Sequence, residues 1–240
     1  AASGPFNMAY GDTQEVVLAE IAAGAEPGID RLGAVALLKF YDAQAQVVFD
    51  NFFNVPTAPD IPKTIASTFD QSVVLSWGSD PVAVNKTESA SQGGYNFQGY
   101  NVYQLPSKAA TASQARRVAT YDIVDGVAKI DDLEFDPTSG VVLRKVKQFG
   151  SDSGVKRYIE ITNDLFKGGT PLLNGSTYYF AVTAYSYNAD PTAVPRQIEN
   201  AMDIFSVTPH SPNPGTAYTG TPGQVITATH STGGSDGAVV

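Results

Sequence analysis

The stretch that decides the fold is Tyr178-Tyr179-Phe180-Ala181-Val182-Thr183-Ala184-Tyr185. Most of its residues are aromatic or β-branched, and both types favour a pleated strand. Successive side chains of a strand point to opposite faces, so Tyr178, Phe180 and Val182 share one face. The turn-forming residues Asn174 and Gly175 come shortly before it. The stretch therefore predicts a central strand of a β-sheet.

Segments with the same two-residue period lie elsewhere in the chain. Trp77 shares a face with Val73 and Leu75, and Tyr100 shares a face with Val102. Residues 78–94 are polar and rich in turn formers, which predicts an extended surface loop. Further strands, bounded by turn residues, are predicted at residues 15–21, 117–121, 126–130, 141–146, 156–161 and 201–207.

One segment has the period of a helix instead. Between Ile29 and Phe53, apolar residues recur every three to four positions without an intervening Pro. Asp30 suits the N-terminus of such a helix, because its side chain caps free backbone N–H groups. The apolar side chains either cover one edge of the β core or form a face that binds another subunit. The residues of such a face are Phe40, Tyr41, Val48 and Phe52.

Proline-rich segments divide the chain into three parts. Pro56, Pro59 and Pro62 fall within one short segment, which disfavours both a helix and a central strand. A second proline-rich spacer follows residue 208. We expect an N-terminal strand and helix at residues 1–55, a β-sandwich at residues 56–208, and a spacer with a terminal strand and tail at residues 209–240.

Composition restricts the classes of function. Charged residues make up 16% of the 240 residues and the formal net charge is −9, so the chain repels phosphate backbones and nucleic acid is not an expected partner. Cysteine is absent, which excludes disulfides and thiolate metal ligands. No apolar run reaches the roughly 18 to 20 residues of a membrane-spanning helix, so we expect no membrane span.

Four motifs between Pro59 and Val207 resemble, in the same order, a fibronectin type III domain. They are a proline-led first strand, Trp77 in the second strand, Gly99-Tyr100-Asn101-Val102-Tyr103, and Leu172 followed by Gly175-Ser176-Thr177-Tyr178. The resemblance implies an immunoglobulin-like β-sandwich in which the Tyr178 hydroxyl hydrogen-bonds to the backbone as a tyrosine corner. The core residues that it implies are Trp77, Tyr100, Val102, Tyr178, Phe180 and Val182.

The segment is longer than the about 100 residues of such domains. The surplus lies between Asp122 and Pro171, where we expect an inserted β-hairpin. The pattern from Ser3-Gly4-Pro5-Phe6 through the helix to Tyr178 is also similar to large exported proteins of the Bacteroidetes and Ignavibacteria kind. This resemblance implies a secreted or cell-surface bacterial protein, a substrate of type IX secretion, in which residues 1–55 end a preceding domain.

Few residues suit catalysis or metal binding. Only two His occur, His210 and His230, and neither lies near a carboxylate at metal-ligand spacing. Asp131, Asp132 and Asp136 are candidate calcium ligands, although turn-forming surface acids explain their clustering adequately. No phosphate-binding glycine motif follows a strand. We therefore predict no catalytic residue, cofactor or metal site, and expect that the chain is not an enzyme.

The sequence predicts a non-enzymatic structural or adhesive module outside the cell, whose partners are other copies of itself or neighbouring domains. Copies could assemble into a surface filament by strand addition. The strand residues available for this are Val225, Ile226 and Thr227, or the segment at residues 14–21. The alternative is an accessory module of a secreted enzyme that binds carbohydrate or protein, since the tyrosines of residues 178–187 could stack on sugar rings.

Overall fold

The computed structural model describes residues 7–13, 15–24, 28–212, 226–228 and 237–239. The protein is mainly β, with antiparallel sheets and two α-helices, which confirms the fold class at this level. In the part of the chain that is described, no helix is both long and apolar enough to cross a membrane.

The smaller main sheet has the order β1-β2-β8. Its strands are β1 (Ile65–Phe69), β2 (Ser72–Ser76) and β8 (Tyr158–Ile161). β1 and β2 form a hairpin in which Phe69 pairs with Ser72, and Gln71 in the connecting turn has a φ of 54°. β8 comes from much later in the chain, so this sheet joins distant segments.

The larger sheet is built around β4 (Tyr95–Leu105) and β11 (Tyr178–Asn188), which pair along nearly their whole length. β3 (Ser91–Gln92) and β5 (Arg116–Asp122) pair with β4 on its other side. β12 (Gln197–Glu199) and β13 (Phe205–Val207) pair with the far side of β11. The strand predicted from residues 178–185, β11, is therefore central in its sheet.

The core lies between these two sheets. Val73, Leu75 and Trp77 from the smaller sheet and its end belong to one buried cluster with side chains of the larger sheet. The rings of Trp77 and Tyr100 lie edge to face, with centroids 5.6 Å apart. The residues that the larger sheet contributes at alternate positions are Tyr100, Val102, Tyr178, Phe180, Val182 and Ala184. Two-residue alternation thus places one face of each sheet in a single dry layer.

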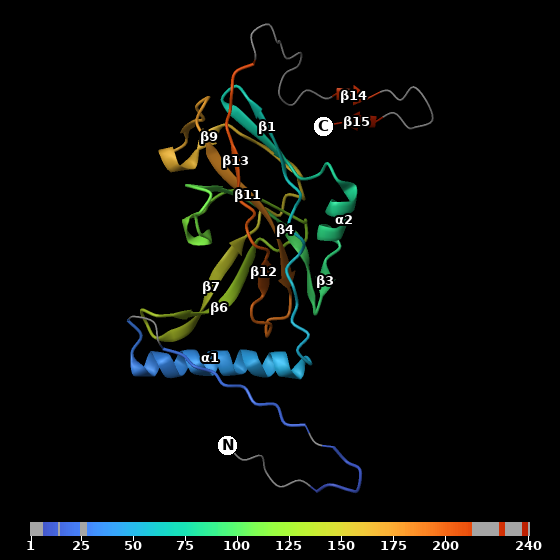
Figure 1. Cartoon of the computed structure of the whole chain (residues 1–240), viewed down its shortest axis with the longest axis vertical. Helices are drawn as coiled ribbons and strands as arrows, with labels where there is room; N and C mark the ends of the chain where they lie inside the picture. The colour runs from blue at the N-terminus through green and yellow to red at the C-terminus, as the bar shows by residue number, and fades with distance from the viewer. Residues whose placement is uncertain (1–6, 14, 25–27, 213–225, 229–236, 240) are drawn as a thin grey trace.

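A hairpin is inserted between β5 and β8, where the surplus length lies. It consists of β6 (Lys129–Asp136) and β7 (Val141–Phe149), which pair only with each other. Figure 1 shows it extending from the sheets toward α1 (Arg31–Asp50), and α1 contacts β7. The predicted strand at residues 126–130 begins only at Lys129, because a turn at Gly126 precedes it.

The long helix confirms the prediction for residues 29–53. Asp30 caps its N-terminus, where Oδ1 accepts a hydrogen bond of 2.7 Å from the backbone N–H of Gly33. Helical geometry ends near Asn51, because Phe52 and Phe53 have positive φ values. Gly33 and Leu37 are the buried residues of the helix.

The prediction of a loop at residues 78–94 was wrong, because a second helix, α2 (Pro81–Glu88), forms there. Asp80 caps it, since its Oδ1 accepts hydrogen bonds from the N–H groups of Val82 and Ala83, and Pro81 occupies the first turn. The helix is short and polar, so it lacks the apolar period on which the prediction relied. The Asp-Pro start signal was nevertheless present in the sequence.

Two strand predictions also need correction. Residues 15–21 form no regular strand, since they pair with no other described strand. The predicted strand at residues 201–207 is shorter, and β12 and β13 lie on either side of an irregular segment that begins at Asn200. Asn200 donates through its side-chain amide to the carbonyl oxygens of Pro59 and Asp60 and accepts from the N–H of Ala184. These side-chain bonds take the place of a continuous strand pairing.

The remaining elements are small. They are η1 (Ala112–Gln114), η2 (Leu165–Lys167), the pair β9 (Asn163–Asp164) and β10 (Thr170–Pro171), and the pair β14 (Ile226–Ala228) and β15 (Gly237–Val239). Ile226 and Thr227 are thus paired within the chain, whereas Val225 lies outside the described residues.

The hydroxyl of Tyr178 accepts a hydrogen bond of 2.9 Å from the backbone N–H of Leu173. We expect Tyr178→Phe to lower the free energy of unfolding by about 1 kcal/mol, because it leaves that N–H without its partner. Urea denaturation measures the change. Tyr179→Phe is the control, since the Tyr179 hydroxyl bonds to no described residue, and equal losses in the two variants would contradict the prediction.

Candidate functional site

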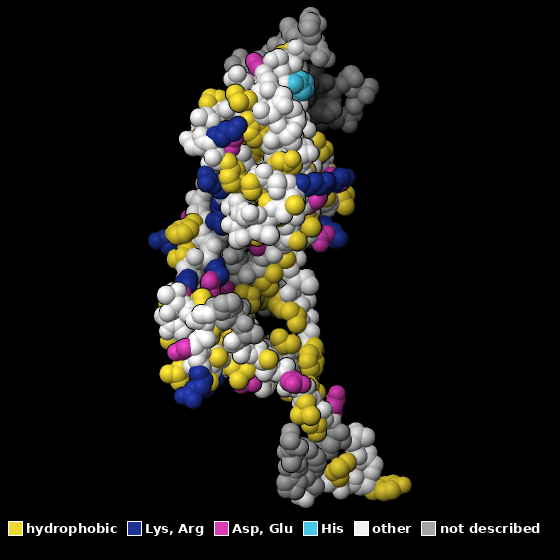
Figure 2. All heavy atoms as spheres, turned by 60° about the vertical axis from the view of Figure 1, so that its left-hand side comes forward, with side chains coloured by type: hydrophobic (Ala, Val, Ile, Leu, Met, Phe, Trp, Pro, Cys, Tyr) yellow, Lys and Arg dark blue, Asp and Glu magenta, His cyan; other side chains and the backbone are white. Residues whose placement is uncertain are grey.

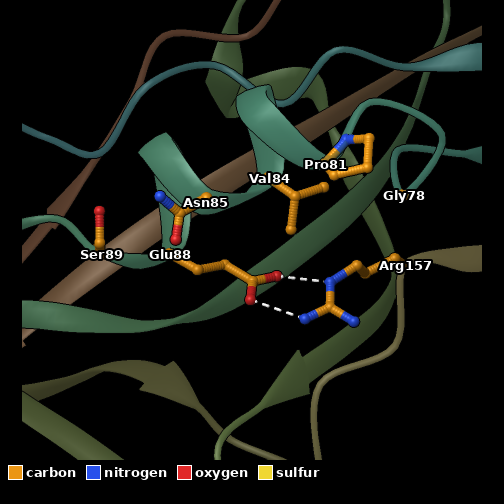
Figure 3. Close-up of a pocket in the computed structure, with 7 residues that line it drawn as sticks. All are labelled: Gly78, Pro81, Val84, Asn85, Glu88, Ser89 and Arg157. Atoms are coloured by element: carbon orange, nitrogen blue, oxygen red, sulfur yellow. Dashed lines mark hydrogen bonds and ion pairs between the residues drawn. The ribbon is translucent and has the colours of Figure 1, made fainter.

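A groove that contains an ion pair lies between α2 and the residue before β8 (Figure 3). Its volume is about 440 Å³. In Figure 3, the carboxylate of Glu88 and the guanidinium of Arg157 point toward each other across it. The groove is lined by Gly78, Pro81, Val84, Asn85, Glu88, Ser89 and Arg157.

Glu88 is fully engaged in this groove. Arg157 donates from Nε and Nη2 to its two carboxylate oxygens, both at 2.7 Å, and Tyr100 donates from its hydroxyl to Oε1 at 2.9 Å. Burial raises the pKa of Tyr100, and its bond to Glu88 adds to this effect. Both carboxylate oxygens of Glu88 therefore accept hydrogen bonds from groups of the protein itself. The arrangement therefore works as a clamp that joins α2 to both sheets.

A second polar cluster lies on the face of the larger sheet that points away from the core. Glu199 accepts through Oε1 from the side chains of Asn101 at 3.1 Å, Tyr103 at 3.0 Å and Thr183. Gln148 of the hairpin donates to Oδ1 of Asn101 at 2.9 Å. Burial, followed by the charge of Glu199, raises the pKa of Tyr103 to about 12. These bonds attach the inserted hairpin to the sheet.

The candidate calcium ligands bind groups of the protein itself. Asp131 lies 3.1 Å from Arg144 and 3.4 Å from Arg196, and the bond from Arg144 lowers its pKa. Asp132 is buried and accepts from the backbone N–H groups of Leu133 and Arg196. Among the described residues, no group of three or more acidic or His side chains could hold a metal ion.

Asp136, the third candidate, lies at the end of β6. Its Oδ2 accepts from the hydroxyl and the backbone N–H of Ser139, and Lys145 lies 3.5 Å from its Oδ1. The hydroxyl bond, with the nearby Lys145 charge, lowers the pKa of Asp136. The three carboxylates therefore have separate protein partners, and nothing in the structure tests calcium binding by them.

A cavity of about 550 Å³ lies between the C-terminal half of α1 and the loops of the larger sheet. Its lining is mainly apolar and includes Val48, Val55, Tyr95, Pro195 and Ile198. Figure 2 shows a hollow in the lower half of the molecule with hydrophobic side chains along its border. The cavity separates the helix from the sheets, so α1 is not packed against the main core.

Phe40 and Tyr41, predicted as subunit contacts, line a neighbouring pocket of about 440 Å³. The same pocket is lined by Leu133 and Phe135 of β6. Phe40 is half-buried and Tyr41 is 38% exposed. The structure thus places these rings beside the inserted hairpin.

Exposed apolar side chains concentrate at the N-terminal end of the described chain. More than half of the large apolar residues that are exposed lie between residues 7 and 55, which is about a fifth of the sequence. They include Leu18 at 79%, Leu32 at 71% and Phe52 at 92% exposure. Isolated exposed apolar residues are normal, but a concentration of this kind marks an interaction surface. The described residues between positions 7 and 55 are therefore the strongest candidate for a binding surface.

The tyrosines of β11 do not form an exposed row. Tyr178 and Tyr185 are buried, and Tyr179 and Tyr187 are half-buried. Their rings therefore fill the layers on both faces of the larger sheet. A flat aromatic strip for sugar stacking is not present on this strand.

No protein-family model matches the chain, and no curated protein matches it.

Sequence patterns did not single out Glu88, Arg157, Glu199 or Gln148, because each depends on partners far away in the chain. The sequence shows the apolar residues at the N-terminal end, but only the structure shows that they are exposed.

We expect Glu88→Ala to lower the free energy of unfolding by about 1–3 kcal/mol, because it leaves the buried Tyr100 hydroxyl without a partner. Adding Tyr100→Phe removes that hydroxyl, so the double variant loses less than the sum of the two single variants. Urea denaturation of the wild type, the two single variants and the double variant gives the four free energies of unfolding. Lys86→Ala is the control, since Lys86 pairs with Asp60 at the surface. Strict additivity would rule out the proposed clamp.

The raised pKa of Tyr103 predicts alkaline sensitivity. The folded state holds the Tyr103 proton to about pH 12, whereas an unfolded chain releases it at about pH 10. The stabilisation that Tyr103 contributes is therefore fully present below pH 10 and is lost as the pH rises toward 12. Between pH 8 and pH 11 the free energy of unfolding should decrease more in the wild type than in Tyr103→Phe. The fully exposed Tyr10 provides the control variant Tyr10→Phe. The same fall in all three proteins would refute the assignment.

Proposed function

We propose that the chain is a non-catalytic structural or adhesive module of an extracellular assembly, built on a fibronectin type III-like sandwich. The two sheets with their shared core, in the order β1-β2-β8 and around β4 and β11, support this proposal. The bond from Leu173 to the Tyr178 hydroxyl agrees with the tyrosine corner that the resemblance implies. In this role the sandwich serves as a rigid body that carries an attachment surface.

The observation that carries the proposal is the exposed apolar surface of residues 7–55. Leaving apolar area in water costs about 25 cal/mol for each Å², so a surface of this kind gains stability when another folded unit covers it. Val16, Val17 and Leu18 are each more than two-fifths exposed and pair with no described strand. An unpaired extended segment can add to the sheet edge of a neighbour. The partner is a second copy or a neighbouring domain.

The course of the chain also suits a connecting module. Figure 1 shows α1 and the segment before it in the lower part of the molecule, whereas the chain leaves β13 toward the top. Attachment points at opposite ends allow modules to follow one another in a line. A structural role for the two charged clusters is in keeping with this proposal, since Glu88 and Glu199 each accept hydrogen bonds from several side chains of the protein itself.

The proposal predicts association of the purified chain that increases with concentration, measured by sedimentation velocity and by electron micrographs. Replacing Val16, Val17 and Leu18 by Ser should weaken association at least about tenfold, because it removes apolar area from the surface. The control replaces Val82, Val124 and Leu173 by Ser; these apolar residues lie outside the N-terminal segment and are together somewhat more exposed than Val16, Val17 and Leu18. A wild-type chain that stays monomeric at all concentrations, or equal weakening in both variants, would overturn the proposal.

A further inference from the structure

The outward side of α1 carries a stripe of exposed residues with the spacing of a helix–helix seam. The residues follow one another at steps of three and four positions, as the a and d positions of a coiled coil do. All of them are exposed, with Leu32 at 71%, Val35 at 45% and Phe49 at 47%. The outer stripe consists of Leu32, Val35, Lys39, Asp42, Gln46 and Phe49.

This stripe is not explained by packing within the chain. The opposite side of α1 holds the buried residues Gly33 and Leu37 and contacts β7. Figure 1 shows α1 lying across the end of the hairpin, with the sheets on one side and the segment of residues 15–24 running past the helix to the other side; Gly24 of this segment lies against Ala34, whereas the residues of the stripe stay exposed. At the end of the stripe, Phe49 packs edge-on against Phe53, which is 60% exposed, at a ring separation of 6.1 Å. Apolar residues thus extend the stripe beyond the helix.

The charges of α1 have an arrangement that disfavours an isolated helix. Its four charged residues are Arg31 and Lys39 in the first half and Asp42 and Asp50 in the second. A cation in the first turn and an anion in the last turn both oppose the helix dipole. None of the four forms an ion pair with a described residue. The pattern therefore calls for a partner outside the fold.

We propose that the outer stripe pairs with the outer stripe of a second copy, antiparallel and about a twofold axis between Lys39 and Asp42. In this register Lys39 lies opposite Asp42 of the partner subunit, and the twofold axis creates the same pair again. Leu32 lies opposite Phe49 of the partner subunit, and Val35 opposite Gln46 of the partner subunit. The six residues of the stripe thus match themselves in reverse order.

The antiparallel arrangement also reverses the unfavourable dipole interactions. It brings Asp50 of the partner subunit to the N-terminal turn of α1 and Arg31 of the partner subunit to its C-terminal turn, where each charge is stabilising. A parallel pair would instead bring each of these four charged residues close to the same residue of the partner subunit. Charged residues inside a seam fix its register at a cost in affinity. Charge complementarity thus favours a second copy over an unrelated covering domain.

Two helices of this length bury less than the roughly 1,200–2,000 Å² of a stable protein–protein interface. We therefore expect weak association from the stripe alone, strengthened by the other exposed apolar residues of the N-terminal segment. The inference rests on the proposed function, since it names the partner and the contact of that attachment surface.

Charge reversal tests the pairing in the full-length chain. Lys39→Asp makes the centre of the stripe wholly acidic and Asp42→Lys makes it wholly basic, so each variant should self-associate about tenfold more weakly than the wild type. An equimolar mixture of the two variants should associate at least as well as the wild type, because an acidic stripe then meets a basic one. Sedimentation equilibrium gives the dissociation constants, and circular dichroism checks the helix content.

Lys108→Asp is the control, since Lys108 is exposed and lies outside α1. It should leave the dissociation constant unchanged. If the wild type associates and the two charge variants associate equally well, or if mixing them restores nothing, the antiparallel pairing is overturned while the proposed function stays intact. A wild type that never associates would overturn both.

Discussion

The structure depends on the dry layer in which Trp77 meets Tyr100 between two antiparallel sheets. Trp77 lies just beyond β2 and donates its backbone N–H to the carbonyl of Arg157 at 2.8 Å, so it also ties the ends of two strands together. Tyr100 connects this layer to α2, because its hydroxyl donates a hydrogen bond to Glu88. Core, clamp and α2 are thus one connected unit, and a change in either ring affects all three.

The other face of the larger sheet follows a different principle. Beside a small apolar cluster of Tyr103, Leu105 and Ala181, the buried side chains of Asn101, Thr183 and Gln148 form hydrogen bonds in a network that includes Glu199. Hydrogen bonds are directional, so this layer holds the inserted hairpin in one orientation. The hairpin in turn carries α1 at its far end. The position of α1, and with it of the proposed attachment surface, is therefore set by polar contacts some distance from the core.

The sequence could predict whatever depends on local period. Strands β4 and β11 follow from alternation at Tyr100 and Tyr178, and α1 follows from its apolar recurrence. Helix α2 was missed because its stability comes from the Asp80 cap and the Glu88 clamp and not from an apolar face. The strand predicted at residues 15–21 has a suitable pattern but no partner strand among the described residues. Pairing partners are a property of the whole fold, which local patterns do not contain.

The helix α1 shows why a local pattern can be right about structure and incomplete about function. A helix of a single compact domain has one apolar stripe and one polar side. Here Leu37 faces inward while Leu32, Val35 and Phe49 face outward, so the apolar residues surround more of the helix than one contact needs. Exposed apolar area costs about 25 cal/mol for each Å², so a helix that is apolar on two sides is more stable when both are covered. The hairpin covers one side, and the reversed charges on the other indicate what kind of surface completes it.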